Sequence, residues 1–233
     1  MQRRDFAKLA LMGAVGAVAA PAVATTTDVK VPKRLLIDQC CGVLLDIQDY
    51  FLDQLNTRRR NKIVRDTTNF ARLLGYYRIP VVVTSEQPID QKGSLPREIA
   101  EHLSDPAVAF EKNAFDLTGE PRIKDHFARL NRKQTIIAGG ETDVCVLQSC
   151  LGLLSLGYEV YLVEELLFSS SRNVDAAIAR MKAEGAIFLT YKSLFYELGA
   201  VVRHTQDQRR RLGPFPGDLP DSAEGSRFDG LLP

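Results

Sequence analysis

The sequence predicts an α/β protein, a Rossmann-like three-layer α/β/α sandwich around a six-stranded, mostly parallel sheet. Six short apolar runs, rich in β-branched residues, recur along the chain at spacings that leave room for a helix between neighbours. Each run is continuously apolar, as in strands buried on both faces of a parallel sheet, whereas half-exposed strands alternate apolar and polar residues. Strand and helix therefore alternate within one domain, which favours the sandwich.

The six predicted strands come from the apolar runs themselves. In chain order they are "GVLLDI" near Gly42, "IPVVVTS" from Ile79, "AVAFEK" near Val108, "QTIIAGG" from Gln134, "YEVYLVEE" from Tyr158 and "GAIFLT" from Gly185.

The segments between these runs carry helical spacing, with apolar residues three or four positions apart. The three stripes are Ile63, Thr67, Phe70 and Leu74; Ile123, Phe127 and Leu130; and Ile178 with Met181. Pro121 suits the first turn of the second helix, and Ser171 or Asn173 suits the start of the third. Gly185 is expected to end the third helix as a C-terminal cap.

The N-terminal segment, residues 1–24, has the pattern of a twin-arginine export signal. Arg3 and Arg4 precede a weakly apolar stretch, which leads to a small-residue cleavage site at about Ala24. The stretch is too short, and too rich in Ala and Gly, to span a bilayer, which takes about 20 apolar residues. We therefore expect a periplasmic protein with no stable membrane insertion once the signal is removed. A retained amphipathic anchor or a disordered leader is the alternative.

The remaining chain divides into a domain, residues 25–203, and a polar, Pro- and Gly-rich tail, residues 204–233. The tail is expected to wrap the surface or a partner subunit, or to be partly disordered. Hydrophobic residues make up 45% of the chain, enough for a sizeable core, and the formal net charge is +1. The arginine runs at 58–60 and 209–211 lack interleaved aromatic residues, so no nucleic-acid partner is expected.

Four cysteines in an exported chain invite a disulfide interpretation. If Cys145 and Cys150 are both helical, their Cα atoms lie beyond the roughly 7 Å that a bridge allows. Cys40 and Cys41 are adjacent and would point to opposite faces of a strand. A bridge from either of them to a distant partner stays open.

Three reactive side chains fall at the carboxyl ends of predicted strands, where open α/β sheets collect their function. Asp46 closes the first strand, Lys112 closes the third, and Cys145 opens the helix after the fourth. Each residue alone is weak evidence. Together at one edge of the sheet they form a candidate catalytic triad.

The chemistry of such a triad is coherent, because the thiolate is the attacking form of cysteine. A helix N-terminus and the ammonium group of Lys112 would both favour the thiolate. Asp46 is too weak a base by about 4.6 pKa units, roughly 6 kcal/mol, unless burial raises its pKa or Lys112 neutralises the product charge. The Gly-Gly turn in "AGGETDVC" would let backbone N–H groups converge and bind an oxyanion.

With these motifs in place, the chain from about Arg34 to Leu198 resembles the isochorismatase-like cysteine hydrolases. The resemblance rests on "LLDIQDYF", "FEKNAFD", "GGETDVCVLQSCLGLLSLGYEVYLVEE" and "SSRNVDAAIARMKAEGAIFLTYKSLFYEL", which fall in the family's order and spacing. In addition, "VVVTSEQP" followed by "LPREI" is most similar to the isochorismatase domain-containing proteins, whose substrates are poorly defined.

This resemblance implies a role for each member of the triad. Asp46 would be the general base, Lys112 the charge stabiliser and Cys145 the nucleophile. A non-proline cis peptide between Gly140 and Glu141 would help to shape the oxyanion hole. The resemblance also implies a homo-oligomer, for which residues 147–156 are a candidate interface as well as a core helix. It implies no cofactor.

The positions of the histidines, and the residues that follow the second predicted strand, argue against a metal-binding site. Nicotinamidase relatives bind a metal through an Asp-x-His pair and a further His after that strand, whereas this chain has "TSEQPIDQKGS" there. His102, His126 and His204 show no ligand spacing, so no metal is predicted. Isochorismatase proper lacks the nucleophilic cysteine and cleaves a vinyl ether, so Cys145 favours hydrolysis of an amide or related acyl group.

The predicted function is therefore a metal-independent cysteine hydrolase that cleaves a C–N bond of a small amide-type metabolite through a thioester. The candidates for the wall of its substrate pocket are Gln48, Phe51, Glu86 and Phe115. Core packing accounts equally well for the two phenylalanines. Two alternatives stay open: a catalytically inactive, oligomeric binding or scaffold protein, and a thiol redox protein that uses Cys40 and Cys41.

Overall fold

A six-stranded, all-parallel sheet forms the centre of the protein, as the sequence predicts. In this computed structural model the sheet has the order β3-β2-β1-β4-β5-β6. The strands are β1 (Cys40–Leu45), β2 (Val81–Glu86), β3 (Ala107–Lys112), β4 (Gln134–Gly140), β5 (Glu159–Phe168) and β6 (Ile187–Leu189). Every apolar run proposed as a strand therefore becomes one, and the three-layer fold is confirmed.

The structure describes residues 33–103, 107–200 and 205–220. The predicted export signal at residues 1–24 lies outside the described residues, as do residues 204 and 221–233 of the predicted tail. Within the described ranges, no helix combines the length and the apolar character that crossing a membrane requires.

Helices connect the strands and cover both faces of the sheet. The α-helices are α1 (Asp49–Leu52), α2 (Thr57–Tyr76), α3 (Ile89–Lys92), α4 (Arg97–Ala100), α5 (Pro121–Leu130), α6 (Leu147–Ser155), α7 (Asp175–Ala183), α8 (Tyr191–Gly199) and α9 (Gln206–Leu212). Shorter turns are η1 (Ile37–Gln39), η2 (Leu117–Gly119) and η3 (Thr142–Val146), of which η3 is a single π-helical turn.

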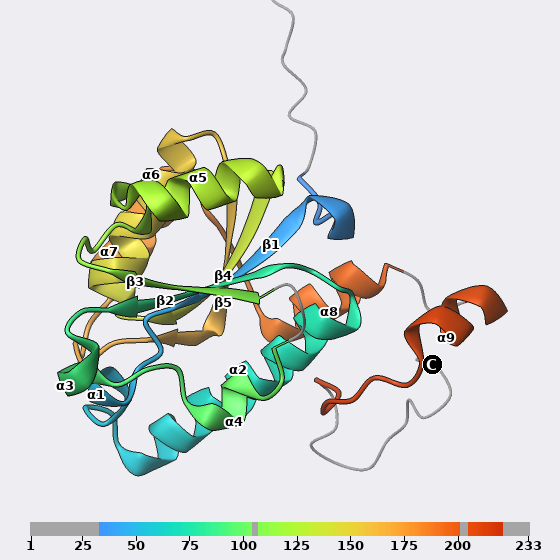
Figure 1. Cartoon of the computed structure of the whole chain (residues 1–233), viewed down its shortest axis with the longest axis horizontal. Helices are drawn as coiled ribbons and strands as arrows, with labels where there is room; N and C mark the ends of the chain where they lie inside the picture. Colours follow the sequence, from blue (N-terminus) through green and yellow to red (C-terminus); the bar gives the residue numbers. More distant parts are fainter. Residues whose placement is uncertain (1–32, 104–106, 201–204, 221–233) are drawn as a thin grey trace, which may run out of the picture. The chain divides into compact units, whose positions relative to one another are not determined.

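The core has two halves, one on each face of the sheet. Helices α2 and α8 bury apolar side chains on one face, and helices α5, α6 and α7 do so on the other (Figure 1). Side chains alternate along a strand, so consecutive residues enter different halves. Cys40 packs with the α2 side and Cys41 with the α5 side, in agreement with the opposite directions that the sequence predicts for this pair.

The helix boundaries follow local chemistry. Asn56 caps α2, and its side chain accepts a hydrogen bond from the Arg59 backbone N–H at 3.0 Å. The predicted stripe on α2, from Ile63 to Leu74, is buried. Pro121 is the first residue of α5.

Helix α7 begins at Asp175, whose N–H donates to the Asn173 side chain, which favours Asn173 over Ser171 as the start signal. After α7, Gly185 has a φ of +102° and donates its N–H to Lys182, which fits the predicted cap.

The described part of the tail, residues 205–220, packs against α2 and α8. The Tyr76 hydroxyl donates to the Gly213 carbonyl at 3.0 Å, and the Phe215 ring meets the rings of Tyr76 and Phe195 edge-on. Asn69 and Asp218 are joined by two hydrogen bonds. These contacts hold residues 205–220 against α2 and α8.

Candidate active site

Four reactive side chains meet at the carboxyl ends of four adjacent strands. Asp46 follows β1, Glu86 and Lys112 are the last residues of β2 and β3, and Cys145 lies in η3 directly after β4. The strand order reverses between β1 and β4, so the four residues stand at the topological switch point of the sheet, where α/β proteins bind ligands. We call these four residues the strand-end cluster.

The Lys112 ammonium group lies at the centre of the cluster. Its Nζ is 2.6 Å from Asp46 Oδ2, 3.6 Å from Cys145 Sγ and 3.9 Å from Glu86 Oε2. It also donates to the Ala114 carbonyl at 3.0 Å. The structure thus brings together the three residues of the predicted triad, which lie far apart in the chain.

Asp46 is held by its neighbours in a sterically costly backbone conformation. Its φ is +48°, in the left-handed region that residues with a side chain rarely adopt, and such strain collects at functional sites. The Thr84 hydroxyl donates to Asp46 Oδ1 at 2.7 Å, and the Asp46 N–H donates to the Thr84 carbonyl at 3.1 Å. Burial raises the pKa of the Asp46 carboxyl above its ordinary value, although Lys112 and Thr84 oppose this shift.

The Cys145 thiol is buried and faces a second carboxylate. Its Sγ donates to Glu86 Oε2 at 3.2 Å. Burial, followed by the charge of Asp46, raises the pKa of Cys145, and Glu86 adds to the rise while Lys112 opposes it. The sequence led us to expect that Lys112 and the helix start would favour the thiolate. Lys112 does act in that direction, but burial and two carboxylates outweigh its ammonium group, so the resting arrangement favours the thiol.

Glu86 is fixed in place from two directions. Its Oε1 forms an ion pair with Lys92 Nζ, from α3. Its backbone N–H and carbonyl both bond to the Gln48 side-chain amide, at 2.7 and 3.0 Å, and Gln48 also donates to the Gly93 carbonyl. Gln48 is completely buried and its amide groups are taken by backbone atoms, so it holds Glu86 in position and does not face open space as a pocket residue would.

The two predicted pocket phenylalanines differ in exposure. Phe51 is buried in the core on the α2 side, with Lys92 Nζ 5.7 Å from the centre of its ring. Phe115 follows Lys112 by three residues and is 54% exposed. Of the two, Phe115 is the one that an incoming molecule could contact directly.

The glycines in "AGGETDVC" have a packing role that the sequence did not reveal. Gly139 and Gly140 end strand β4 and do not form a separate turn. A Cβ on Gly139 would lie 2.0 Å from the Leu45 carbonyl oxygen, and one on Gly140 would lie 2.4 Å from the Phe168 ring. The Gly140–Glu141 peptide bond is cis, the geometry that the family resemblance implies.

Polar side chains that the sequence analysis overlooked position the segment around Cys145. Asp143 accepts hydrogen bonds from the hydroxyl groups of Ser169 and Ser171, both at 2.6 Å, and Glu141 accepts from the Ser170 N–H. These contacts tie η3 to the loop after β5. The available signals were the two acidic residues in "ETD", the serine run at residues 169–171, and the polar Thr84 directly after three valines.

The cluster contains potential metal donors, but a cation already lies among them. The ligand atoms of Asp46, Glu86 and Cys145 lie within 4.8 Å of one another. Lys112 Nζ approaches all three, so its ammonium group supplies the positive charge that a metal would supply. This donor set does not fit a divalent ion.

The histidines lie away from this cluster or outside the described residues. His102 contacts Arg72, and His126 packs edge-on against Phe110. His204 lies outside the described residues. Neither described histidine is therefore in a position to complete a metal site.

All four cysteines are free and buried. Burial is the main cause that raises the pKa of Cys40, Cys41 and Cys150 to about 12 in each case. A redox function needs an accessible thiol of low pKa, so this arrangement gives no support to a redox role for Cys40 and Cys41.

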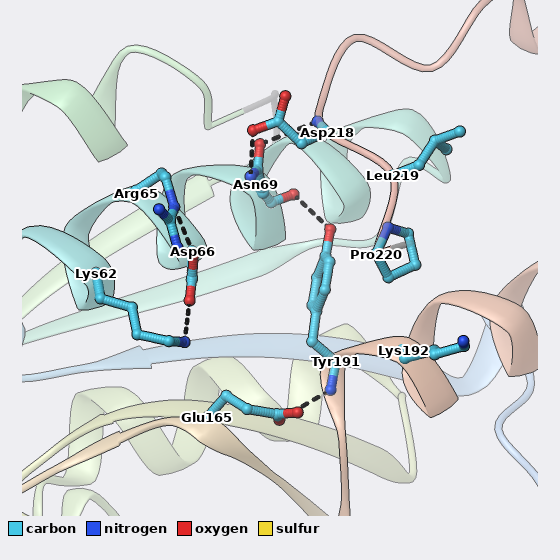
Figure 2. Close-up of a pocket in the computed structure, with 10 residues that line it drawn as sticks. All are labelled: Lys62, Arg65, Asp66, Asn69, Glu165, Tyr191, Lys192, Asp218, Leu219 and Pro220. Carbon is cyan, nitrogen blue, oxygen red and sulfur yellow. Dashed lines mark hydrogen bonds and ion pairs between the residues drawn. The ribbon is translucent and has the colours of Figure 1, made fainter. Parts of the chain in front are cut away.

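The cavity in Figure 2 lies elsewhere, between α2, α8 and the C-terminal segment, and has a volume of about 400 Å³. Its lining residues are Lys62, Arg65, Asp66, Asn69, Glu165, Tyr191, Lys192, Asp218, Leu219 and Pro220. We call it the α2–α8 cavity. None of its lining residues belongs to the strand-end cluster.

Comparison with known proteins gives the same family as the motifs. The family model of the isochorismatase domain matches residues 40–193. A secreted isochorismatase effector of Phytophthora sojae is 32% identical over 170 residues, which cover 71% of this chain and 79% of the relative. Isochorismatase domain-containing protein 2 of Bos taurus is 28% identical over 176 residues, which cover 74% of this chain and 81% of the relative.

A solved structure shares the fold. The YcaC gene product of Escherichia coli, described as an octameric hydrolase of unknown specificity, superimposes with a TM-score of 0.69 at 23% identity. The match covers 78% of this chain and 90% of that one.

Proposed function

We propose that this chain, which belongs to the isochorismatase family, is a cysteine hydrolase that cleaves a C–N bond of a small amide-type metabolite without a metal. The fold is that of the family's hydrolases. One observation carries the finer proposal: Lys112 Nζ lies 2.6 Å from the Asp46 carboxylate and 3.6 Å from the Cys145 sulfur, and the Asp46 and Lys112 side chains are 0% exposed.

The proposed reaction begins with transfer of the thiol proton to Asp46. Cys145 then attacks the uncharged carbonyl carbon, and the carbonyl oxygen becomes an oxyanion held by backbone N–H groups between Gly140 and Cys145. The protonated Asp46 returns its proton to the leaving nitrogen, the C–N bond breaks, and the acyl group remains on sulfur as a thioester. Water then hydrolyses the thioester, which releases the acid and restores the thiol.

Burial supports this assignment of the base. The ordinary pKa of an aspartate carboxyl is about 4.6 units below that of a free thiol, so proton transfer from the thiol to the carboxylate costs roughly 6 kcal/mol. Burial of Asp46 raises the pKa of its carboxyl and so narrows this gap. Lys112 contributes differently, because its ammonium group stabilises whichever neighbour carries the negative charge as the proton moves.

The test is ammonia release from a panel of small amides, imides and carbamoyl compounds. Cys145→Ala serves as the blank. Cys150→Ala is the matched control, because it removes the same group from a buried cysteine on the adjoining helix. We expect release by wild type and by Cys150→Ala, and none above background by the blank. Equal release by wild type and blank across the whole panel would refute the hydrolase proposal.

We propose a homo-oligomer as the working form, supported by the octameric description of the Escherichia coli relative. One face of α6 is core, with Leu147, Cys150 and Leu153 buried. The adjoining Leu156 is exposed and is available for a contact between subunits. Light scattering on the purified protein tests the proposal, and a monomer at micromolar concentration would contradict it.

We also propose export by the twin-arginine route, on the basis of residues 1–24 of the sequence. Replacement of Arg3 and Arg4 by lysine should keep the protein in the cytoplasm, as measured by cell fractionation. Unchanged periplasmic recovery of this variant would contradict the proposal.

A further inference from the structure

Glu86 differs from the other charged residues of the strand-end cluster because solvent reaches it. The side chains of Asp46 and Lys112 are 0% exposed, whereas that of Glu86 is 11% exposed and that of its partner Lys92 is 19% exposed. A molecule that enters the site therefore meets the Glu86 carboxylate before it meets Asp46 or Lys112.

The Glu86 carboxylate is also the hydrogen-bond acceptor of the resting thiol. Its Oε2 accepts from Cys145 Sγ at 3.2 Å, and its Oε1 is held by Lys92. Asp46 is engaged differently, since Oδ1 accepts from Thr84 and Oδ2 faces Lys112. Cys145 also hydrogen-bonds to Asp46, but the acceptor to which the resting thiol donates at 3.2 Å is Glu86 and not the residue proposed as general base.

Glu86 is poorly suited to be the base itself. Burial acts to raise its pKa, but hydrogen bonds from Lys92 and Cys145 outweigh burial and hold the pKa of Glu86 below its ordinary value. The pKa of Asp46 is shifted in the opposite direction. Asp46 is therefore the stronger base, and the thiol must turn from Glu86 to Asp46 before it can react.

This turn would leave Glu86 Oε2 without its donor in a nearly closed site. An unsatisfied carboxylate oxygen is costly, so a water molecule, or a group of the substrate that displaces this water, has to replace the thiol as donor. Lys112 Nζ, at 3.9 Å, is too far for a hydrogen bond and already serves Asp46. An N–H group of the substrate can fill the vacated position, whereas an ester has no such donor.

We propose that Glu86, fixed by Lys92, is a positioning residue that holds the Cys145 thiol at rest and accepts an N–H of the substrate when that thiol turns to Asp46. The inference rests on the proposed hydrolase function and narrows its substrates to acyl compounds with an N–H group beside the reacting carbonyl. Primary amides and carbamoyl compounds belong to this class. Binding of such a substrate frees the thiol, which links substrate binding to activation of the nucleophile.

The thiol half of the proposal is tested by the rate at which iodoacetamide alkylates Cys145 between about pH 6 and 10, followed by mass spectrometry of its peptide. The charged groups that face the sulfur are Asp46, Glu86 and Lys112, with Lys92 behind Glu86. Glu86→Gln keeps the shape but removes a negative charge. We expect the pH midpoint of Cys145 alkylation in this variant to fall by about one pH unit. Alkylation at neutral pH should then be about tenfold faster than in wild type.

Lys92→Met should raise the pH midpoint of Cys145 alkylation. Without the Lys92 ammonium group, the negative charge of Glu86 is not offset and disfavours the thiolate more strongly. Glu111→Gln and Lys62→Met are the matched controls: Glu111 contacts Gln87 and Lys62 pairs with Asp66, both away from the sulfur. We expect each control to stay within about twofold of wild type. A Glu86→Gln profile that superimposes on wild type overturns the proposal, and so do shifts of both site variants in one direction, which loosened packing would produce.

The substrate half is tested with matched pairs that share an acyl group, beginning with acetamide and methyl acetate. In Glu86→Gln we expect kcat/KM for the amide to fall about 10- to 100-fold, and that for the ester to change by less than about threefold. Equal losses for amide and ester would mean a merely structural role and would overturn this half. If wild type hydrolyses no amide, the proposed function fails together with the substrate half, while the alkylation profiles still decide whether Glu86 holds the thiol.

Discussion

The strand-end cluster and the α2–α8 cavity both place acidic side chains beside basic ones, but they do so in different surroundings. In the cluster, the ion pair between Lys112 and Asp46 is 0% exposed on both sides. In the cavity, Lys62 and Arg65 both pair with Asp66 while the two basic side chains stay mostly in water. The cavity has an open volume of about 400 Å³, whereas the cluster has the nucleophile and the shifted pKa values.

The difference indicates that exclusion of water, more than the presence of paired charges, shifts the pKa values of the groups involved. Water screens the cavity's ion pairs, and pairs of this kind contribute little energy. Inside the cluster each charge acts strongly on its neighbours, so the protonation of one group depends on the others. Variants at matched positions in the two regions can test this contrast.

Cys145→Ala should have the largest effect. Removing the nucleophile is expected to lower hydrolysis by about a thousandfold or more, since Cys145 has the only thiol in the strand-end cluster. In the cavity, Tyr191→Phe removes the hydroxyl that donates to the Asn69 carbonyl and should change kcat/KM by less than about twofold. Steady-state rates on the best panel substrate measure both. A large loss of kcat/KM in Tyr191→Phe would indicate that the active site includes the α2–α8 cavity.

Lys112→Met should have the largest effect on stability. It leaves the buried Asp46 carboxylate without its ion pair, which is expected to cost about 3–5 kcal/mol. Lys62→Met, in the cavity, should change the free energy of unfolding by no more than about 0.5 kcal/mol. Urea unfolding curves give both values. Similar small losses in the two variants would mean that Lys112 is more hydrated than the structure indicates.

Phe215→Ala separates stability from activity. The ring packs edge-on against Tyr76 and Phe195, with centroids 5.5 and 5.2 Å apart, beside the cavity. Because Phe215 is only partly buried, its loss should lower the free energy of unfolding by about 1–2 kcal/mol while kcat/KM stays constant. Thermal unfolding and the amide assay, run on the same sample, check the two expectations. A parallel fall in activity would show that the tail reaches the strand-end cluster.

The pH dependence of stability should show the smallest effect. The pKa of Glu86 is lower in the folded protein than in the unfolded chain, so its stabilising contribution is present above about pH 4.5 and is lost as the pH falls through the folded value. Wild type should therefore lose more free energy of unfolding than Glu86→Gln between about pH 5 and 3. Because water reaches Glu86 and screens its charge, the difference in acid loss between wild type and Glu86→Gln should be small. Unfolding curves at several pH values measure this difference. A larger loss of unfolding free energy at low pH in Glu86→Gln than in wild type would contradict the prediction.

Local sequence patterns were enough to predict the sheet, the helices α2, α5 and α7, and the three residues of the predicted triad. Apolar runs and helical stripes are local patterns, and each one became the predicted element. The rule that function lies at the carboxyl ends of strands then selected Asp46, Lys112 and Cys145 without coordinates, and the structure places their reactive groups together.

How these groups share protons, and which neighbours they have, depends on contacts between segments that are distant in the chain. Glu86 and Cys145 are 59 residues apart in the chain, and no local pattern indicates that the thiol donates to this carboxylate. The same holds for Gln48, which faces backbone groups and no open space, and for Gly139, whose missing side chain admits the Leu45 carbonyl. The reason is physical: a pKa depends on burial and on nearby charges, and both are set by elements that come together only when the chain folds.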